Sequence, residues 1–181
     1  MKEWEELEYE AKKCTKCKLS KTRKNVVFSE GNKKAKIMII NEMVTAEQES
    51  KNKIIVGKIG ELLENALKVV GIKKEEVYIT NLVKCRTPAN RNPEKDEYLT
   101  CIEYLRNQVI LVKPKVIVLI GKNIAEIILG NNEVDKIEKV NCIVDKKGIK
   151  YLCIENPIEL IRDENKKIGF IKKLELINKI V

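Results

Sequence analysis

Short apolar runs along the chain predict the strands of a sheet. Four runs, at 36–40, 77–80, 116–120 and 150–154, are compact enough to be buried strands. The last run is preceded by the polar turn Asp145-Lys146-Lys147-Gly148 and by apolar residues at 143–144, a pattern typical of a hairpin.

Segments with helical spacing lie between and around these runs. Apolar residues recur at intervals of three and four over 57–70, which Gly71 ends, and over a long stretch that Pro93 opens and Lys113-Pro114 ends. The same spacing predicts helices over 2–13, over 123–129 and over roughly the last eighteen residues.

The alternation of strands and helices indicates an α/β protein with a central, mainly parallel four-stranded sheet flanked by helices. Neither an internal repeat nor a linker interrupts the pattern, so residues 1–181 are expected to form a single domain. In such sheets ligands bind beyond the carboxyl ends of the strands. Those ends read Asn41-Glu42, Thr80-Asn81, Gly121-Lys122 and Glu155-Asn156. They predict a polar binding site, although asparagine is also a common strand-ending residue.

The composition narrows the chemistry that this site can perform. The 181 residues include six cysteines, no histidine, and 36 Lys+Arg against 27 Asp+Glu, which gives a net charge of +9. Without an imidazole, Ser-His-Asp hydrolysis, Cys-His proteolysis and His-ligated zinc or haem are excluded. Hydrophobic residues make up 44% of the chain, which excludes wholesale disorder.

A cytoplasmic monomer without a membrane partner is expected. No apolar stretch reaches membrane-spanning length, and charged residues occupy positions 2, 3, 5 and 6, where a signal peptide would be apolar. Cysteines in the cytoplasm more often bind metal or do chemistry than form disulfides. The heavy use of Lys, Glu and Ile resembles that of hyperthermophile proteins, in which intracellular disulfides do occur.

The positive charge is concentrated between Glu10 and Glu30, a stretch without an acidic residue. Its cations are Lys12, Lys13, Lys16, Lys18, Lys21, Arg23 and Lys24. Two interpretations stay open for this basic run. It is a phosphate-binding surface, whose contacts would make binding sensitive to salt, or it is a solvated segment.

The six cysteines divide into four candidate metal ligands and two others. The candidate ligands are the CxxC pair Cys14 and Cys17, and Cys85 and Cys101, which lie sixteen positions apart. Four such thiolates can close a tetrahedral site, and from spacing alone zinc and an iron–sulfur cluster fit equally. Cys142 and Cys153 face each other across the predicted hairpin, where buried small hydrophobes are favoured over a functional pair.

The longest motif surrounds the third cysteine, where residues 79–93 read ITNLVKCRTPANRNP. This motif resembles that of the family-four uracil-DNA glycosylases, the iron–sulfur members of their superfamily, whose usual pattern is ITN-x-V-K-C-R-P-P-x-N-R-x-P. The similarity continues through 36–40, 56–63, 113–115 and 118–121, and so covers almost the whole chain. It implies a uracil-DNA glycosylase-like three-layer fold and a [4Fe-4S] cluster on the four candidate ligands, with structural zinc as the alternative.

The sequence departs from the family pattern in three segments. The first motif, usually G-E-x-P-G, reads NEMVT at 41–45, so that only Glu42 is kept. Ile55 stands where the family has a phenylalanine that stacks on the flipped base. Asn156 stands in place of the histidine in the segment H-P-x-x-L-L-R. A carboxamide donates a neutral hydrogen bond but carries no positive charge, so we expect Asn156 to stabilise a leaving anion less than an imidazolium would.

The resemblance implies a role for each site residue. Asn81 would read the O4/N3 edge of uracil, because its carboxamide offers both a donor and an acceptor. Glu42 would face the sugar, and Asn156 would donate to a uracil oxygen. The base pocket would be lined by Asn41, Ile55 and Gly57. The DNA-binding set would be Arg86, Asn90, Arg91, Leu160 and Arg162. Leu160 matches an apolar wedge that fills the gap left by a flipped base and equally matches a core position on a short helix.

Two functions of different classes follow, both with DNA as the partner. The first is a monofunctional DNA glycosylase that flips and excises uracil or a related deaminated base. The second is a catalytically degenerate module that binds DNA or a repair partner without cleaving. The retained Glu42 and Asn81 favour the enzyme, whereas the lost G-x-P-G turn, phenylalanine and histidine favour the binding module.

Overall fold

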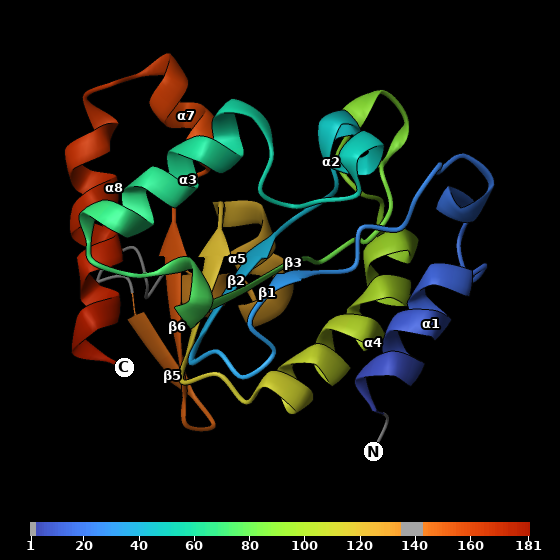
Figure 1. The fold of residues 1–181 in the computed structure, drawn as a ribbon, viewed down its shortest axis with the longest axis horizontal. Helices are drawn as coiled ribbons and strands as arrows, with labels where there is room; N and C mark the ends of the chain where they lie inside the picture. The colour runs from blue at the N-terminus through green and yellow to red at the C-terminus, as the bar shows by residue number, and fades with distance from the viewer. Residues whose placement is uncertain (1–2, 135–142) are drawn as a thin grey trace.

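The computed structural model describes residues 3–134 and 143–181 and contains one six-stranded sheet of order β1-β3-β2-β4-β6-β5 (Figure 1). The strands are β1 (Glu30–Gly31), β2 (Ile37–Asn41), β3 (Val77–Asn81), β4 (Val116–Ile120), β5 (Ile143–Lys146) and β6 (Ile149–Ile154). The α-helices are α1 (Trp4–Lys13), α2 (Ala46–Lys51), α3 (Gly57–Val69), α4 (Lys95–Val112), α5 (Lys122–Leu129), α7 (Pro157–Arg162) and α8 (Lys166–Glu175). Short 3-10 turns span Lys18–Lys21, Lys74–Glu76, Pro88–Asn90 and Leu176–Lys179.

The four central strands β3, β2, β4 and β6 are parallel, and β1 and β5 pair antiparallel at the two edges. The predicted α/β fold with a mainly parallel four-stranded core is therefore confirmed, as is the β5–β6 hairpin. Strand β1 was not predicted, because two residues are too few to show an apolar pattern.

The sheet lies between two layers of helices. One face, which includes Ile39 and Val118, packs in a core cluster with residues of α3, α7 and α8. The other face, which includes Met38 and Ile117, packs in a cluster with residues of α4 and α5, and α1 lies outside against α4. Figure 1 shows α3 and α8 on one side of the sheet and α4 and α1 on the other. Because both faces are covered, the central strands read as continuous apolar runs.

Local capping sets several helix boundaries that the sequence pattern placed differently. Helix α4 begins at Lys95 rather than Pro93, because Glu94 is its N-cap and forms a capping box with Glu97. Helix α2 was not predicted from its polar sequence, and a capping box between Thr45 and Gln48 opens it. The predicted terminal helix is the shorter α8, continued by a 3-10 turn.

Two further predictions concern membrane-spanning segments and the two remaining cysteines. Within residues 3–134 and 143–181, no helix is long and apolar enough to cross a membrane. Cys142 lies outside the described residues, and Cys153 is partly buried on β6.

Candidate functional site

Asparagines gather where the four parallel strands end. Asn41 and Asn81 are the last residues of β2 and β3, and they are register partners in the sheet. Asn156 follows β6, and Asn123 lies in the first turn of α5, just after β4. Sequence reasoning stopped at Gly121-Lys122 and missed Asn123. The signal that would have found it is the asparagine at each of the other three strand ends.

Asn81 is the most unusual of these residues, because its carboxamide is fully buried and without a partner. Its exposed fraction is 0%, and neither Oδ1 nor Nδ2 hydrogen-bonds to any described residue. A buried amide without a hydrogen bond costs about 1–3 kcal/mol, so native proteins rarely leave one unless a ligand uses it. The Asn81 main chain, by contrast, is held firmly, because its carbonyl accepts a hydrogen bond from Lys84 Nζ.

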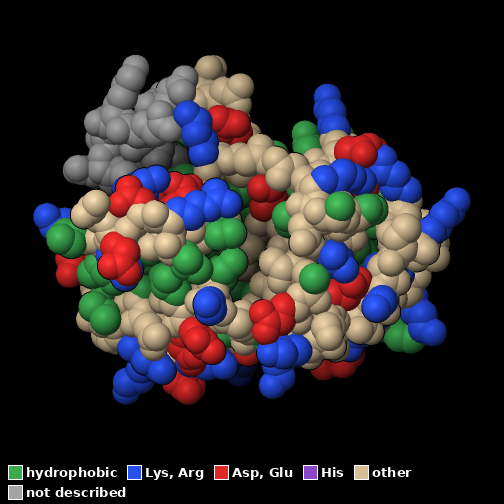
Figure 2. Space-filling view, turned by 90° about the horizontal axis from the view of Figure 1, so that it is seen from above, with side chains coloured by type: hydrophobic (Ala, Val, Ile, Leu, Met, Phe, Trp, Pro, Cys, Tyr) green, Lys and Arg blue, Asp and Glu red, His purple; other side chains and the backbone are tan. Residues whose placement is uncertain are grey.

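A cleft of about 450 Å³ lies near the carboxyl ends of the parallel strands, between α2, α3 and α7. Its lining includes Asn41, Ile55 and Asn90. Figure 2 shows a hollow on the face that carries α2 and α7, with both basic (Lys, Arg) and acidic (Asp, Glu) side chains around it. Two of the three residues predicted for the base pocket, Asn41 and Ile55, therefore line one cleft, and the third, Gly57, begins α3 beside it.

Gly57 has a structural reason to be glycine. Its φ is +63°, and a Cβ there would lie 2.1 Å from Glu47 Oε2. Glu47 lines the cleft from α2 and forms an ion pair with Lys51 at 2.7 Å. Sequence reasoning missed Glu47, because an acidic residue in a polar helix carries no signal of its own.

Glu42 follows β2 and is partly buried, and its Oε1 accepts a hydrogen bond from Asn123 Nδ2. Burial raises the pKa of the Glu42 carboxyl above its ordinary value, and the Asn123 hydrogen bond acts in the opposite direction. The carboxylate predicted to face the sugar is therefore partly desolvated and has one neutral donor.

Asn156 is the N-cap of α7, and its Oδ1 accepts a hydrogen bond from the backbone N–H of Ile158 at 3.1 Å. Asparagine is among the best N-cap residues. This hydrogen bond orients the Asn156 side chain. The residue that stands in place of the family's histidine therefore has a local structural role as a helix cap. The next residue, Pro157, lines the cleft.

The four candidate metal ligands line one small cavity, whose volume of about 10 Å³ compares with 450 Å³ for the cleft. Cys14 ends α1, Cys17 precedes the first 3-10 turn, Cys85 lies in the loop after β3, and Cys101 lies on α4. Within the described residues, no three Cys, Asp or Glu side chains are already arranged around a single ion.

The surroundings of these sulfur atoms suit thiolate ligands. Arg23 donates from Nη1 to Cys85 Sγ at 3.5 Å and from Nη2 to the Cys14 carbonyl at 2.6 Å. The backbone N–H of Lys84 donates to Cys101 Sγ at 3.4 Å. Burial raises the pKa of the Cys85 thiol to about 12 and also raises that of Cys101. A cationic metal centre supplies the positive charge that such buried thiolates need, so the donor set fits one.

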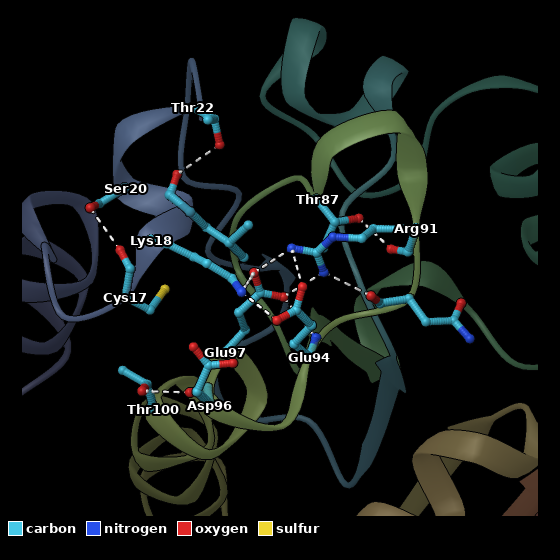
Figure 3. A network of polar contacts seen from close by, with 12 residues as sticks. Cys17, Lys18, Ser20, Thr22, Thr87, Arg91, Glu94, Asp96, Glu97 and Thr100 are labelled. Carbon is cyan, nitrogen blue, oxygen red and sulfur yellow. Dashed lines mark hydrogen bonds and ion pairs between the residues drawn. The ribbon is translucent and has the colours of Figure 1, made fainter.

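Two of the arginines predicted to bind DNA are held by the protein itself. Arg91 forms a bidentate ion pair with Glu97, with Nη1–Oε2 at 2.8 Å and Nη2–Oε1 at 2.7 Å (Figure 3). Arg86 donates from Nε to Asn90 Oδ1 at 3.0 Å and lies 3.9 Å from the buried Glu49 carboxylate. Their predicted contacts with phosphate remain predictions.

On α7 the structure places Leu160 in the core, with an exposed fraction of 1%, which is the second of its two predicted alternatives. The exposed apolar residues of this helix are Ile158 and Ile161, and both line the cleft. Arg162, the last residue of α7, is exposed. Six residues are too few for the apolar spacing to show from sequence which side of α7 faces the core.

The basic run is partly neutralised by contacts within the protein. Lys12 pairs with Glu8 at 2.7 Å, Lys18 pairs with Glu94, and Arg23 contacts the cysteine cavity. The run therefore combines a structural function with a surface excess of positive charge.

Comparison with known proteins shows the family to which the chain belongs. The chain belongs to the uracil DNA glycosylase superfamily, whose family model matches residues 28–180. It is similar to the Type-4 uracil-DNA glycosylase of Saccharolobus solfataricus, with 46% identity over 115 residues that make up 63% of this chain and 53% of that protein.

Two further relatives carry the same description. The Sulfurisphaera tokodaii Type-4 uracil-DNA glycosylase is 39% identical over 149 residues, which cover 82% of this chain and 66% of that protein. The Archaeoglobus fulgidus Type-4 uracil-DNA glycosylase is 34% identical over 168 residues, 89% of this chain and 84% of that protein. The matches therefore span about half to two thirds of the first two relatives and most of the third. The family resemblance predicted from residues 79–93 is confirmed.

Proposed function

We propose that this chain is an iron–sulfur DNA glycosylase that flips uracil, or a related deaminated base, out of DNA and hydrolyses its N-glycosidic bond. The observation that carries the proposal is the buried Asn81 carboxamide at the end of β3, which has no hydrogen-bond partner among the described residues. Asn81 is not itself a lining residue of the 450 Å³ cleft, but its register partner Asn41 is. A nucleobase edge supplies the donor and the acceptor that this side chain lacks. The names of the relatives support the same substrate.

Base recognition would use Asn81 from the strand end and apolar surface from α3 and α7. Nδ2 of Asn81 would donate to uracil O4, and its Oδ1 would accept from uracil N3–H. Ile55 would line the pocket with apolar surface but would not offer an aromatic ring on which the base could stack. Asn41, beside Asn81 in the sheet register, would contribute polar surface at the mouth of the cleft.

Bond cleavage develops positive charge on the sugar and negative charge on the departing uracil. The ionised Glu42 would face the sugar, where it stabilises the cation or orients water. The Nδ2 of Asn156, whose Oδ1 caps α7, would donate to a uracil oxygen. A donor aimed at developing charge contributes about 3 kcal/mol.

The proposed cofactor is a [4Fe-4S] cluster held by Cys14, Cys17, Cys85 and Cys101, with structural zinc as the alternative. Bound there, the group would join the amino-terminal segment, the loop after β3 and α4 through covalent ligands. Arg23 and the Lys84 amide would donate to the ligand sulfur atoms and so orient them.

Replacing Asn81 with alanine is expected to lower uracil excision by at least a hundredfold, because one side chain supplies both hydrogen bonds to the base edge. The metal-loaded protein is incubated with oligonucleotides that carry uracil, hypoxanthine or xanthine, and strand breaks are counted after alkali. Asn107→Ala is the matched control, since the Asn107 amide donates within α4, to the Glu103 carbonyl, and should leave excision unchanged.

Strand breaks at uracil that disappear in Asn81→Ala support the enzyme. An absence of breaks with all three bases, together with salt-dependent binding of the same oligonucleotides, would reject it and favour the binding module.

Replacing Ile55 with phenylalanine is expected to raise kcat/KM for uracil excision about five- to hundredfold, because stacking of a base on an aromatic ring contributes about 1–3 kcal/mol. The cleft offers room for the ring. Ile55→Leu, which adds no aromatic surface, is the control and should leave kcat/KM within about twofold. Equal values for the two variants would show that no base stacks at this position.

A further inference from the structure

The side chain of Asn123 hydrogen-bonds to the carboxylate of Glu42. Its Nδ2 donates to Glu42 Oε1, and the two residues come from different elements, α5 and the end of β2. The contact therefore joins two neighbouring strand ends, because β4, which leads into α5, pairs with β2.

The backbone that presents Asn123 is rigid. Gly121 follows β4 and is the N-cap of α5, with φ +98°, and its N–H donates to the Ile154 carbonyl of β6 at 2.8 Å. The two residues after Asn123, Ile124 and Ala125, are 0% exposed and anchor α5 to the sheet. Asn123 itself is exposed, so it contributes little to the core and its side chain is set by the fixed first turn of the helix.

Among residues 3–134 and 143–181, the Glu42 carboxylate that Asn123 contacts forms no ion pair. The loop after β3 packs against Glu42 through a hydrogen bond from Val83 N–H to the Glu42 carbonyl at 3.0 Å, and this loop carries Lys84 and Arg86. Helix α5 carries Lys122 and Glu126. In the part of the chain that the structure describes, Glu42 forms an ion pair with none of these four side chains. Lys84 Nζ is instead bonded to Thr80 and Gln108.

We propose that Asn123 is a positioning residue that orients the Glu42 carboxylate at the strand ends and favours its ionised form. The consequence for catalysis rests on the proposed function, in which the ionised Glu42 faces the sugar. The positioning itself does not, since it concerns two residues of this chain. The chain has no histidine, and the donor to the Glu42 carboxylate is the carboxamide of Asn123. A carboxamide does not titrate, so it stays a hydrogen-bond donor across the working pH range.

The direction of the effect follows from the hydrogen bond. A donor to a carboxylate stabilises the charged form. Burial already raises the pKa of Glu42, and removing the Asn123 donor is expected to raise it further. Asn123→Ala removes the donor, and Asn123→Asp also places a second negative charge beside the carboxylate. The expected order of the Glu42 pKa is therefore wild type, then Asn123→Ala, then Asn123→Asp, with the highest value last.

The test titrates the metal-loaded protein with ¹³C-labelled glutamate carboxyls by NMR, and Glu42→Gln assigns the Glu42 signal. The midpoint of that signal is expected to shift upward in Asn123→Ala and further in Asn123→Asp. Asn131→Ala, at an exposed position beyond the end of α5, is the control and should leave the midpoint unchanged. Equal midpoints in wild type, Asn123→Ala and Asn123→Asp would overturn the proposal, whether or not the protein excises uracil.

A second measurement links the same variants to catalysis. The acid limb of the kcat profile against pH is expected to move upward in the same order, while KM for the oligonucleotide stays the same. A purely structural defect would lower kcat at every pH instead. If Glu42→Gln excises uracil as fast as wild type, the catalytic use of Glu42 under the proposed function fails, and the NMR titration alone decides the positioning role.

Discussion

Replacing Glu97 with alanine is expected to lower the free energy of unfolding by about 3 kcal/mol, the lower end of the range for breaking a buried ion pair. The Glu97 carboxylate is 0% exposed and also accepts the Glu94 backbone N–H at 2.7 Å, so the substitution removes both the pair and the helix cap (Figure 3). Arg91 keeps an exposed fraction of 33%, so water recovers part of its lost hydrogen bonding. The Arg91 guanidinium lowers the pKa of Glu97, which agrees with an ionised partner at neutral pH.

Denaturant unfolding followed by circular dichroism measures this loss. Glu103→Ala is the matched control, because Glu103 lies on the same helix, is 65% exposed, and its contact with Arg106 is a surface ion pair, which contributes about 0–1 kcal/mol. Losses of equal size in the two variants would show that burial does not distinguish the two carboxylates.

Replacing Cys85 with serine is expected to abolish the metal centre. Cys85 is 6% exposed, and a serine hydroxyl is a far weaker ligand than a thiolate, so the proposed site would lose one of four ligands without a substitute. The variant should lose the visible absorption of an iron–sulfur cluster and most of its iron and sulfide, and its melting temperature should fall, since metal binding is coupled to folding.

Cys153→Ser is the control for this loss, because Cys153 lies on β6 and does not line the cavity. It should keep the absorption, the iron and the sulfide of the wild type. A colourless wild-type protein with stoichiometric zinc would reject the cluster and favour the structural zinc site. Full iron content in Cys85→Ser would remove Cys85 from the ligand set.

The parts of the fold that the sequence predicts are those with a strong local signal. The strands β2, β3 and β4 are buried on both faces and β6 partly so, and their short, mainly apolar runs are typical of buried parallel strands. The pattern misses α2, whose sequence AEQESK has no apolar stripe, because the helix depends on the Thr45–Gln48 capping box and on its place beside the cleft.

The same division applies to the site. Asn41 and Asn81 were predicted because a strand end fixes where a side chain lies, and the four cysteines because their spacing matches a motif. Three features were beyond the sequence: the Asn123–Glu42 contact, Glu47 beside Gly57, and the Arg91–Glu97 pair. Each depends on which side chains meet once the chain has folded, and an arginine in a loop reads the same whether it faces phosphate or a buried carboxylate.

The placement of Lys84 links the two sites mechanically. Its backbone N–H contacts the Cys101 sulfur, while its Nζ holds the carbonyl of Asn81, whose side chain is the unpartnered carboxamide of the strand end. Lys84 also precedes Cys85 directly in the chain. One residue therefore contacts both a candidate metal ligand and the backbone of Asn81, so we expect a displacement of the cysteine cavity to reach the end of β3.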